Sequence, residues 1–165
     1  MRDLAVSNST CLIALERIDR LDLLRRSFGR VVIPPEVQHE IGLAFSWLEV
    51  QQTVNSGLFS ALRLSLGDGE SAAIALAVEL PDAAILLDDL KARRIASRLG
   101  IPVIGTVGLI LRCKRLGLLP EVSPIIYKLQ SAGFHLSKRL LRQALLSAGE
   151  ESSEETDMTT NGGPS

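Results

Sequence analysis

The segment Ala84-Ile85-Leu86-Leu87-Asp88-Asp89 places four apolar residues directly before two carboxylates. A short apolar run without alternation is typical of a strand buried on both faces of a parallel sheet. Ligands of open α/β sheets bind beyond the carboxyl ends of the strands. Asp88 and Asp89 are therefore candidate functional residues. One of them is also in position to cap the helix that the pattern predicts from Leu90 to Leu99.

The composition favours one intracellular domain. The chain has 165 residues, of which 46% are hydrophobic and only 4% aromatic, so helices packed on a small sheet are favoured over a β-sandwich. No apolar run approaches the roughly 20 residues that cross a bilayer, and the first residues lack the long apolar region of a signal peptide. We expect a cytoplasmic protein without membrane association.

The acidic residues are unevenly distributed along the chain. Residues 150–165 contain five acids, no base and no apolar pattern, which is typical of a disordered tail. We therefore divide the chain into a domain, 1–149, and an acidic tail, 150–165. Without the five acids of the tail, the rest of the chain has 14 acidic and 18 basic residues. This mildly basic domain is compatible with an anionic partner.

Strand and helix patterns alternate along the domain. Buried strands are predicted at 4–7, 31–33, 84–87 and 101–104, with a further possible strand at 47–50. A single long helix is predicted from Ser9 or Thr10 to about Gly29, and further helices follow each later strand, with two more after Val122. This order predicts a three-layer α/β/α sandwich with a mainly parallel sheet of four to five strands.

Four acids and one amide are expected at one edge of this sheet. Asn8 ends the first strand, Glu40 lies about a turn into the helix after the second, and Glu70 opens the helix before the central strand. Right-handed crossovers would bring these residues towards Asp88 and Asp89. Clustered carboxylates repel each other unless a cation neutralises them, and oxygen ligands without His or Cys favour Mg²⁺ or Mn²⁺. Taken singly, Glu70 could complement its helix dipole, Glu40 could be a solvated helix residue and Asn8 a turn residue.

The two cysteines, Cys11 and Cys113, have no spacing that indicates a zinc site or a disulfide. Cys11 falls in the predicted first turn of a helix, where the pKa of a thiol can be lowered. A role as small buried apolar filler is favoured for it by the general burial of cysteine.

Several segments resemble PIN-domain proteins. Val6-Ser7-Asn8-Ser9-Thr10-Cys11-Leu12-Ile13-Ala14-Leu15 is similar to their opening, an apolar strand followed by Asp or Asn, Thr or Ser, Ser, Pro, Leu and Ile. The similarity continues through 32–37 with Glu40, then through 69–77, 86–93 and 105–108. Over residues 4–148 the chain most resembles a prokaryotic PIN-like branch, long catalogued as a domain of unknown function and often regarded as VapC-like toxin components.

This resemblance implies a metal-dependent ribonuclease in which acids hold Mg²⁺ or Mn²⁺ over the scissile phosphate. Glu40, Glu70, Asp88 and Asp89 match acidic positions, with the choice between Asp88 and Asp89 as metal ligand left open. Asn8 matches a position that is usually Asp in active PIN nucleases. An amide oxygen brings no charge, so metal affinity should fall.

The resemblance also implies an RNA substrate, a cognate antitoxin protein and a possible homodimer, as in the toxin of a toxin–antitoxin pair. The alternative is a PIN-fold module that binds nucleic acid or protein and whose catalysis is impaired by Asn8. A phosphoacceptor receiver domain is disfavoured because Asn8 and Gly105-Thr106 lack its acid and its lysine. Dinucleotide and P-loop NTPase functions are disfavoured because their glycine motifs are missing.

Six basic residues are candidates for contacts with RNA phosphates, although a solvated helix face is the simpler interpretation for most of them. They are Arg93, Arg94, Arg98, Arg112, Lys114 and Arg115. No aromatic residue is identified for base stacking, so selectivity is expected to come from RNA shape or from the partner.

Overall fold

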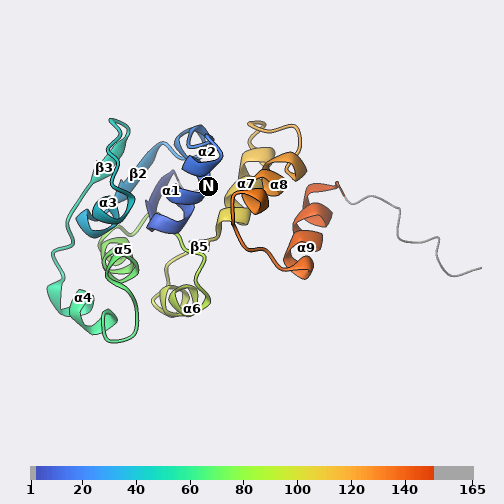
Figure 1. The fold of residues 1–165 in the computed structure, drawn as a ribbon. Coiled ribbons are helices and arrows are strands. Elements are labelled where there is room, and N and C mark those ends of the chain that lie inside the picture. The colour runs from blue at the N-terminus through green and yellow to red at the C-terminus, as the bar shows by residue number, and fades with distance from the viewer. Residues whose placement is uncertain (1–2, 151–165) are drawn as a thin grey trace, which may run out of the picture.

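The computed structural model describes residues 3–150, which form a five-stranded parallel sheet flanked by helices (Figure 1). The strand order is β3-β2-β1-β4-β5, and every pairing is parallel. The strands are β1 (Leu4–Ser7), β2 (Arg30–Ile33), β3 (Leu48–Val50), β4 (Ala83–Leu86) and β5 (Val103–Ile104). The predicted α/β/α sandwich with four to five strands is confirmed.

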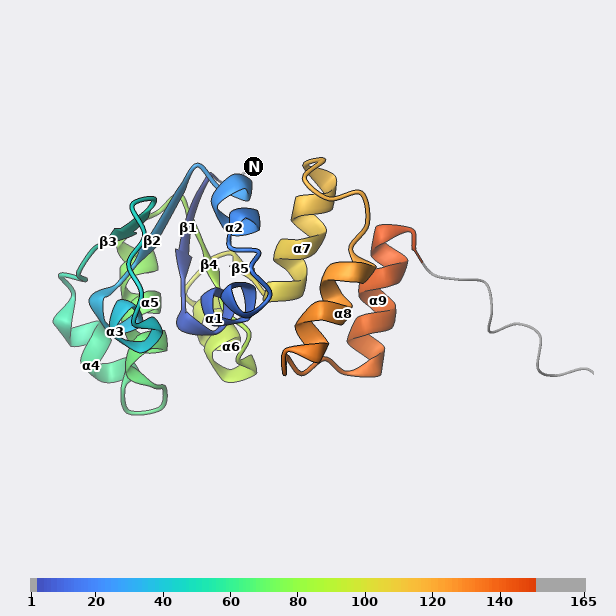
Figure 2. The same ribbon diagram turned by 45° about the horizontal axis from the view of Figure 1, so that its top comes forward.

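Helices cover both faces of the sheet. They are α1 (Ser9–Arg17), α2 (Asp22–Ser27), α3 (Pro35–Ile41), α4 (Ser56–Leu62), α5 (Asp68–Glu79), α6 (Leu90–Arg98), α7 (Thr106–Arg115), α8 (Ser123–Ser131) and α9 (Lys138–Ala148). Within residues 3–150, none of these helices has the length and apolar character needed to cross a membrane. Figure 2 shows α7, α8 and α9 grouped beside one end of the sheet.

Alternate residues of the strands pack into two separate hydrophobic cores, one on each face of the sheet. Ala5 and Val31 pack with α1, α2 and the α7–α9 group, whereas Val6 and Val32 pack with α5 and α6. Successive side chains of a strand point to opposite faces, so each core takes every second residue. The small buried residues of α5, from Ala72 to Ala77, allow this helix to lie close to the sheet.

The long helix predicted from Ser9 to about Gly29 is wrong, because the chain forms α1 and α2 with a turn between them. Asp19 has a left-handed backbone (φ 55°), which Asp tolerates better than most residues. Arg20 then donates to the Asp22 carboxylate at 2.9 Å, at the start of α2. The apolar spacing continues through this break because both helices pack on the same core.

Glu150, which the sequence assigned to the acidic tail, is bound to the folded domain. Its carboxylate accepts hydrogen bonds from the backbone amides of Val122 at 2.8 Å and Ser123 at 3.1 Å, and from Lys114 at 2.8 Å. These bonds satisfy amides at the start of α8, which lack partners within the helix. The other residues of the predicted tail, 151–165, lie outside the described part of the chain.

Candidate active site

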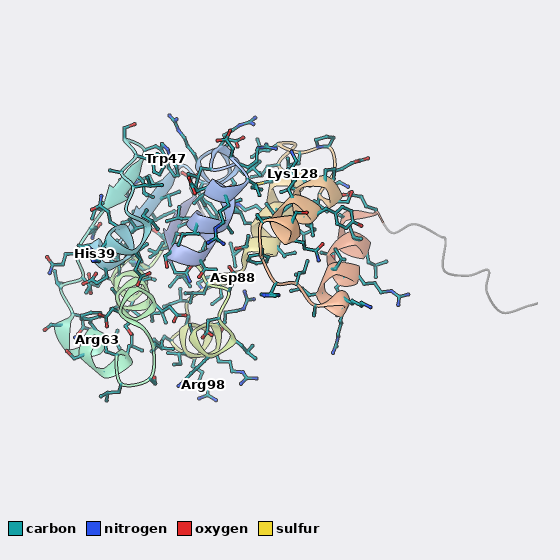
Figure 3. The ribbon with its side chains drawn as sticks, viewed as in Figure 1. His39, Trp47, Arg63, Asp88, Arg98 and Lys128 are labelled. Atoms are coloured by element: carbon teal, nitrogen blue, oxygen red, sulfur yellow. The ribbon has the colours of Figure 1, made fainter. Side chains whose placement is uncertain are left out.

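The chain reverses its direction of winding between the two central strands. β1 leads through α1 to β2 on one side, whereas β4 leads through α6 to β5 on the other. Such a switch point leaves a crevice at the carboxyl ends of the strands. The amide of Asn8 donates to the carbonyl of Leu86 at 3.2 Å, which places Asn8 beside the end of β4. Figure 3 shows Asp88 at this edge, between α1 and α6.

The two aspartates after β4 make different hydrogen bonds. Asp89 caps α6, because its Oδ2 accepts from the amide of Ala92 at 2.9 Å. Asp88 accepts instead from Thr106, at 2.8 Å from the amide and 2.6 Å from the hydroxyl. The prediction that one of the two caps the helix is confirmed for Asp89. The bond to Thr106 was missed, although a Thr directly before a helix was visible in the sequence.

Glu40 reaches this edge from α3. Its Oε2 accepts a hydrogen bond from the hydroxyl of Ser9, the residue after Asn8. Gly69 lies directly against the same carboxylate, since a Cβ on Gly69 would lie 2.4 Å from Oε1 of Glu40. The glycine therefore leaves the space that Glu40 occupies next to the start of α5.

Glu70 lies among the other acids. Burial raises its pKa above the ordinary value, and the negative charge of Asp89 and, less strongly, that of Glu40 act in the same direction. The backbone amide of Gly67 opposes them without cancelling the shift. These electrostatic interactions show that Glu40, Glu70 and Asp89 share one region, as the sequence predicted.

Among residues 3–150, four buried side-chain oxygens lack a hydrogen-bond partner. Two of them, Oδ1 of Asn8 and Oε2 of Glu70, belong to the predicted site residues, and the others are Oε2 of Glu36 and Oγ of Ser71. Buried polar atoms are normally satisfied, and carboxylate and amide oxygens are the ligands that Mg²⁺ and Mn²⁺ prefer. The donor set therefore fits a hard divalent cation.

The carboxylates are not gathered around one point in their present conformations. Among residues 3–150, no three His, Cys, Asp or Glu side chains are placed to hold a metal ion together. Glu40, Asp88 and Asp89 are each held by a hydrogen bond to a neighbouring group. A bound cation would have to compete with those bonds.

The six predicted RNA-contacting residues differ in their exposure and in their position relative to Asp88. Arg93 is half-buried and donates to the carbonyl of Leu87 at 2.9 Å, just below Asp88. Arg94 and Arg98 are exposed on α6, and Figure 3 shows Arg98 on the outer side of that helix, away from Asp88. Arg115 is exposed and lines a cavity that also reaches Asp88.

Arg112 and Lys114 both make intramolecular contacts, and their predicted contacts with RNA stay a prediction. Arg112 packs its guanidinium 4.1 Å from the centroid of the Phe28 ring and donates to the carbonyl of Ser27 at 2.8 Å. Lys114 is bound to Glu150. Both residues therefore stabilise the fold at positions where phosphate contacts had been predicted.

A loop from the C-terminal half of the chain also reaches the site. Phe134 and His135, in the turn between α8 and α9, line two cavities of about 450 and 680 Å³, and Asp88 lines both as well. No sequence pattern indicates this proximity, because these residues follow Asp88 by more than one complete helix–turn–helix unit. The expectation that no aromatic residue is available near the site is therefore corrected.

Cys11 is fully buried beneath the site, as the filler interpretation predicted. Burial and, less strongly, the nearby charge of Asp88 raise the pKa of its thiol to about 12. A thiol with such a pKa remains protonated at neutral pH and is a poor nucleophile.

Comparison with known families agrees with this architecture. A family model described as a PIN domain matches residues 4–150, which is almost the whole described chain. No curated protein and no solved structure matches the chain. The PIN domain is a nuclease fold, and PIN domains generally use divalent metals. The predicted resemblance is thus confirmed, and the chain belongs to the PIN-domain family.

Proposed function

We propose that this protein is a metal-dependent endoribonuclease whose active site is the acidic edge at the ends of β1 and β4. The family supports nuclease chemistry in general. The observation that carries the proposal is that, within residues 3–150, Oδ1 of Asn8 and Oε2 of Glu70 are buried without a hydrogen-bond partner. Unsatisfied oxygens among carboxylates are unfavourable in the empty protein, and a cation would satisfy them.

Asn8, Glu40, Glu70 and Asp89 are the proposed residues that hold Mg²⁺ or Mn²⁺, together with Asp88 once its bonds to Thr106 rearrange. Such an ion orients the phosphate, activates water and stabilises the leaving oxygen of a phosphodiester. Glu70 contributes a carboxylate that binds a proton more readily than an ordinary Glu.

Arg93 supplies positive charge next to these acids. A Cβ on Gly105 would lie 2.6 Å from Nη1 of Arg93 and 3.1 Å from Oδ1 of Asp88, so the guanidinium and the carboxylate flank the same glycine. An RNA phosphate that enters the edge meets this cation as well as the acids. We therefore retain Arg93 as a phosphate contact, in addition to its bond to Leu87.

The decisive experiment measures cleavage of a mixed pool of structured RNAs with Mn²⁺, with Mg²⁺ and with EDTA. Glu70→Gln is the test variant, because it removes a charge and keeps the shape of the side chain. Asp68→Asn is the matched control, since Asp68 lies one residue before Gly69 in the same first turn and forms an exposed ion pair with Arg63. We expect metal-dependent cleavage that Glu70→Gln abolishes and Asp68→Asn retains. Equal cleavage by both variants would place the activity elsewhere or in a contaminant.

A second function is a PIN-fold binding module with impaired catalysis. The supporting observation is that Asn8 is neutral and that three carboxylates do not converge within the described residues. Titration of wild type and Asn8→Asp with Mn²⁺ separates the two functions. A large gain of cleavage in Asn8→Asp supports impairment, whereas strong wild-type cleavage removes that alternative.

We also propose that the protein is the toxin of a toxin–antitoxin pair, with an antitoxin protein as its partner and a homodimer as its assembly. The resemblance to toxin-like PIN proteins supports this assignment. Growth arrest on expression of wild type, but not of Glu70→Gln, tests the toxin role. Light scattering of the purified chain tests the homodimer.

A further inference from the structure

The cavity of about 450 Å³ beside Asp88 has the size and lining of a small-ligand site. It lies between α1, which contributes Thr10 and Arg17, and the loop that contains Phe134 and His135. Asp88 and Asp89 line it as well. Ligand pockets of folded proteins occupy roughly 300–1,000 Å³, so a nucleoside fits within it.

We propose that this cavity is a nucleoside subsite, in which an unpaired base of single-stranded RNA packs against Phe134 and His135 next to the scissile phosphate. The proposal deepens the nuclease function and rests on it. The chemistry of the lining matches a nucleotide: a phenyl and an imidazole ring offer flat faces for a base, and Arg17 offers a cation for a neighbouring phosphate.

The loop that carries the two rings is held in place by the end of α8. Phe134 and Gly133 donate their amides to the carbonyls of Leu129 at 2.9 Å and Gln130 at 3.0 Å. Gly133 has φ 96°, a backbone conformation that favours glycine. The side chain of Phe134 is partly buried against the core. The ring is therefore fixed before any ligand binds, which reduces the entropy lost on stacking.

Arg17 approaches this loop from α1. A Cβ on Gly133 would lie 3.9 Å from Nη1 of Arg17, so the guanidinium lies against the glycine that shapes the loop. Arg17 and His135 are both exposed. Arg17 and the carboxylates of Asp88 and Asp89 line the same cavity, which suits a strand with one phosphate at the metal site and the next beside Arg17.

Double-stranded RNA does not suit this site, because a paired base is stacked within the helix and cannot present both faces. The subsite therefore predicts preference for single strands. The second cavity, of about 680 Å³, shares Phe134, His135 and Asp88 and continues past Arg93 and Arg115. Because the two cavities share these residues, we assign the second cavity to the part of the strand that continues beyond the subsite.

The test compares binding and cleavage by the full chain. Binding of a fluorescent single-stranded oligoribonucleotide is measured by anisotropy in EDTA, which prevents metal-dependent cleavage, alongside the same strand annealed to its complement. Cleavage is measured with Mn²⁺ as kcat and KM. The variants are Phe134→Leu, which removes the flat ring but keeps apolar packing, and Phe134→Trp, which restores a ring. Phe59→Leu is the matched control, because Phe59 is a partly buried Phe on α4 that lines neither cavity.

We expect Phe134→Leu to weaken single-strand binding and raise KM about 10-fold, the scale of losing one stacked base, with kcat little changed. Phe134→Trp and Phe59→Leu should remain near wild type, and wild type should bind the single strand more tightly than the duplex. Equal binding by Phe134→Leu and Phe59→Leu would overturn the subsite and leave the cavity to a protein partner. Equal or tighter duplex binding, or no single-strand binding by wild type, would also overturn it.

If Phe134→Leu fails to fold, as circular dichroism would show, the exposed residues decide the question. The double variant Arg17→Gln/His135→Gln should weaken single-strand binding and reduce its dependence on salt. Unchanged binding would overturn the subsite. The binding measurement is independent of cleavage. If the variants bind single strands more weakly but the wild type does not cleave RNA, the subsite is kept and the nuclease function is rejected. If the wild type cleaves RNA but the variants bind as tightly as the wild type, the nuclease function is kept and the subsite is rejected.

Discussion

Asp88 accepts hydrogen bonds from both the amide and the hydroxyl of Thr106, so the acid at the end of β4 also fixes the first turn of α7. A residue with both roles is a poor choice for testing catalysis alone. Substitution of Asp88 would disturb the helix that carries much of the first core.

Thr106→Val should therefore lower the free energy of unfolding by about 1–2 kcal/mol, because it leaves one oxygen of Asp88 without its partner at a buried position. Thr106→Ser keeps the hydroxyl and is the matched control. Urea unfolding monitored by circular dichroism measures both. Equal stabilities of the Val and Ser variants would show that the hydroxyl bond contributes nothing.

Glu70→Gln should stabilise the protein in EDTA at pH 7, by about 0.5 kcal/mol or more. Burial and the charges of Asp89 and Glu40 raise the pKa of Glu70, so the folded state binds its proton more tightly than the unfolded chain. The contribution of Glu70 to stability therefore falls as the pH rises above its ordinary pKa of 4.5. Thermal unfolding at pH 4 and pH 7 should show the gap between variant and wild type widening with pH. A constant gap would contradict this prediction.

Gly69→Ala should lower cleavage without lowering the stability of the fold. The new Cβ would occupy the space of the Glu40 carboxylate, which is the end of an exposed, flexible side chain and can move away. Ala also favours a helix over Gly by up to about 1 kcal/mol. We expect unchanged or higher thermal stability together with at least about 10-fold lower cleavage, the scale for a displaced catalytic group. Retained activity would show that the position of Glu40 is unimportant.

Asn8→Asp should destabilise the protein in EDTA and make its stability depend on the cation. Asn8 is 3% exposed and its backbone amide donates to the carbonyl of Leu86, two residues before Asp88, so a charge on its side chain would be buried at the acidic edge. We expect a loss of about 1–3 kcal/mol in EDTA that millimolar Mn²⁺ largely restores, measured as Tm in a metal titration. If the Tm of the Asn8→Asp protein does not change with the Mn²⁺ concentration, this edge does not bind the ion.

Glu150→Gln should lower the free energy of unfolding by about 1–3 kcal/mol at pH 7. Burial opposes the charge of Glu150, but hydrogen bonds from Lys114 and the amides of Val122 and Ser123 outweigh it and hold the pKa at about 2. Because the pKa of Glu150 is lower in the folded state than in the unfolded chain, its charged carboxylate stabilises the fold above pH 4.5. This stabilisation is lost as the pH falls towards 2. The exposed Glu121→Gln is the control. Urea unfolding at pH 7 and pH 3 should show the difference between the two variants shrinking at low pH.

The sequence predicted the sheet because its strands are short apolar runs whose burial does not depend on distant partners. The placement of Asn8 and Asp88 followed from chain connectivity, since parallel strands share an edge. The break at Asp19 was not predictable, because apolar periodicity reports which face is buried and not whether the helix is continuous. The partners Thr106 and Glu150 were missed for another reason: their bonds join residues 18 and 28 positions apart, and no local pattern marks such pairs.

The bond between Glu150 and the start of α8 also affects the order in which the chain can fold during synthesis on the ribosome. β1 can pair with β2 early in synthesis, whereas its other neighbour in the sheet, β4, is made only much later. The amides of Val122 and Ser123 must wait for a carboxylate that is made 28 and 27 residues later. The bonds that join Lys114 and the start of α8 to Glu150 therefore form only after nearly all of residues 3–150 have been synthesised.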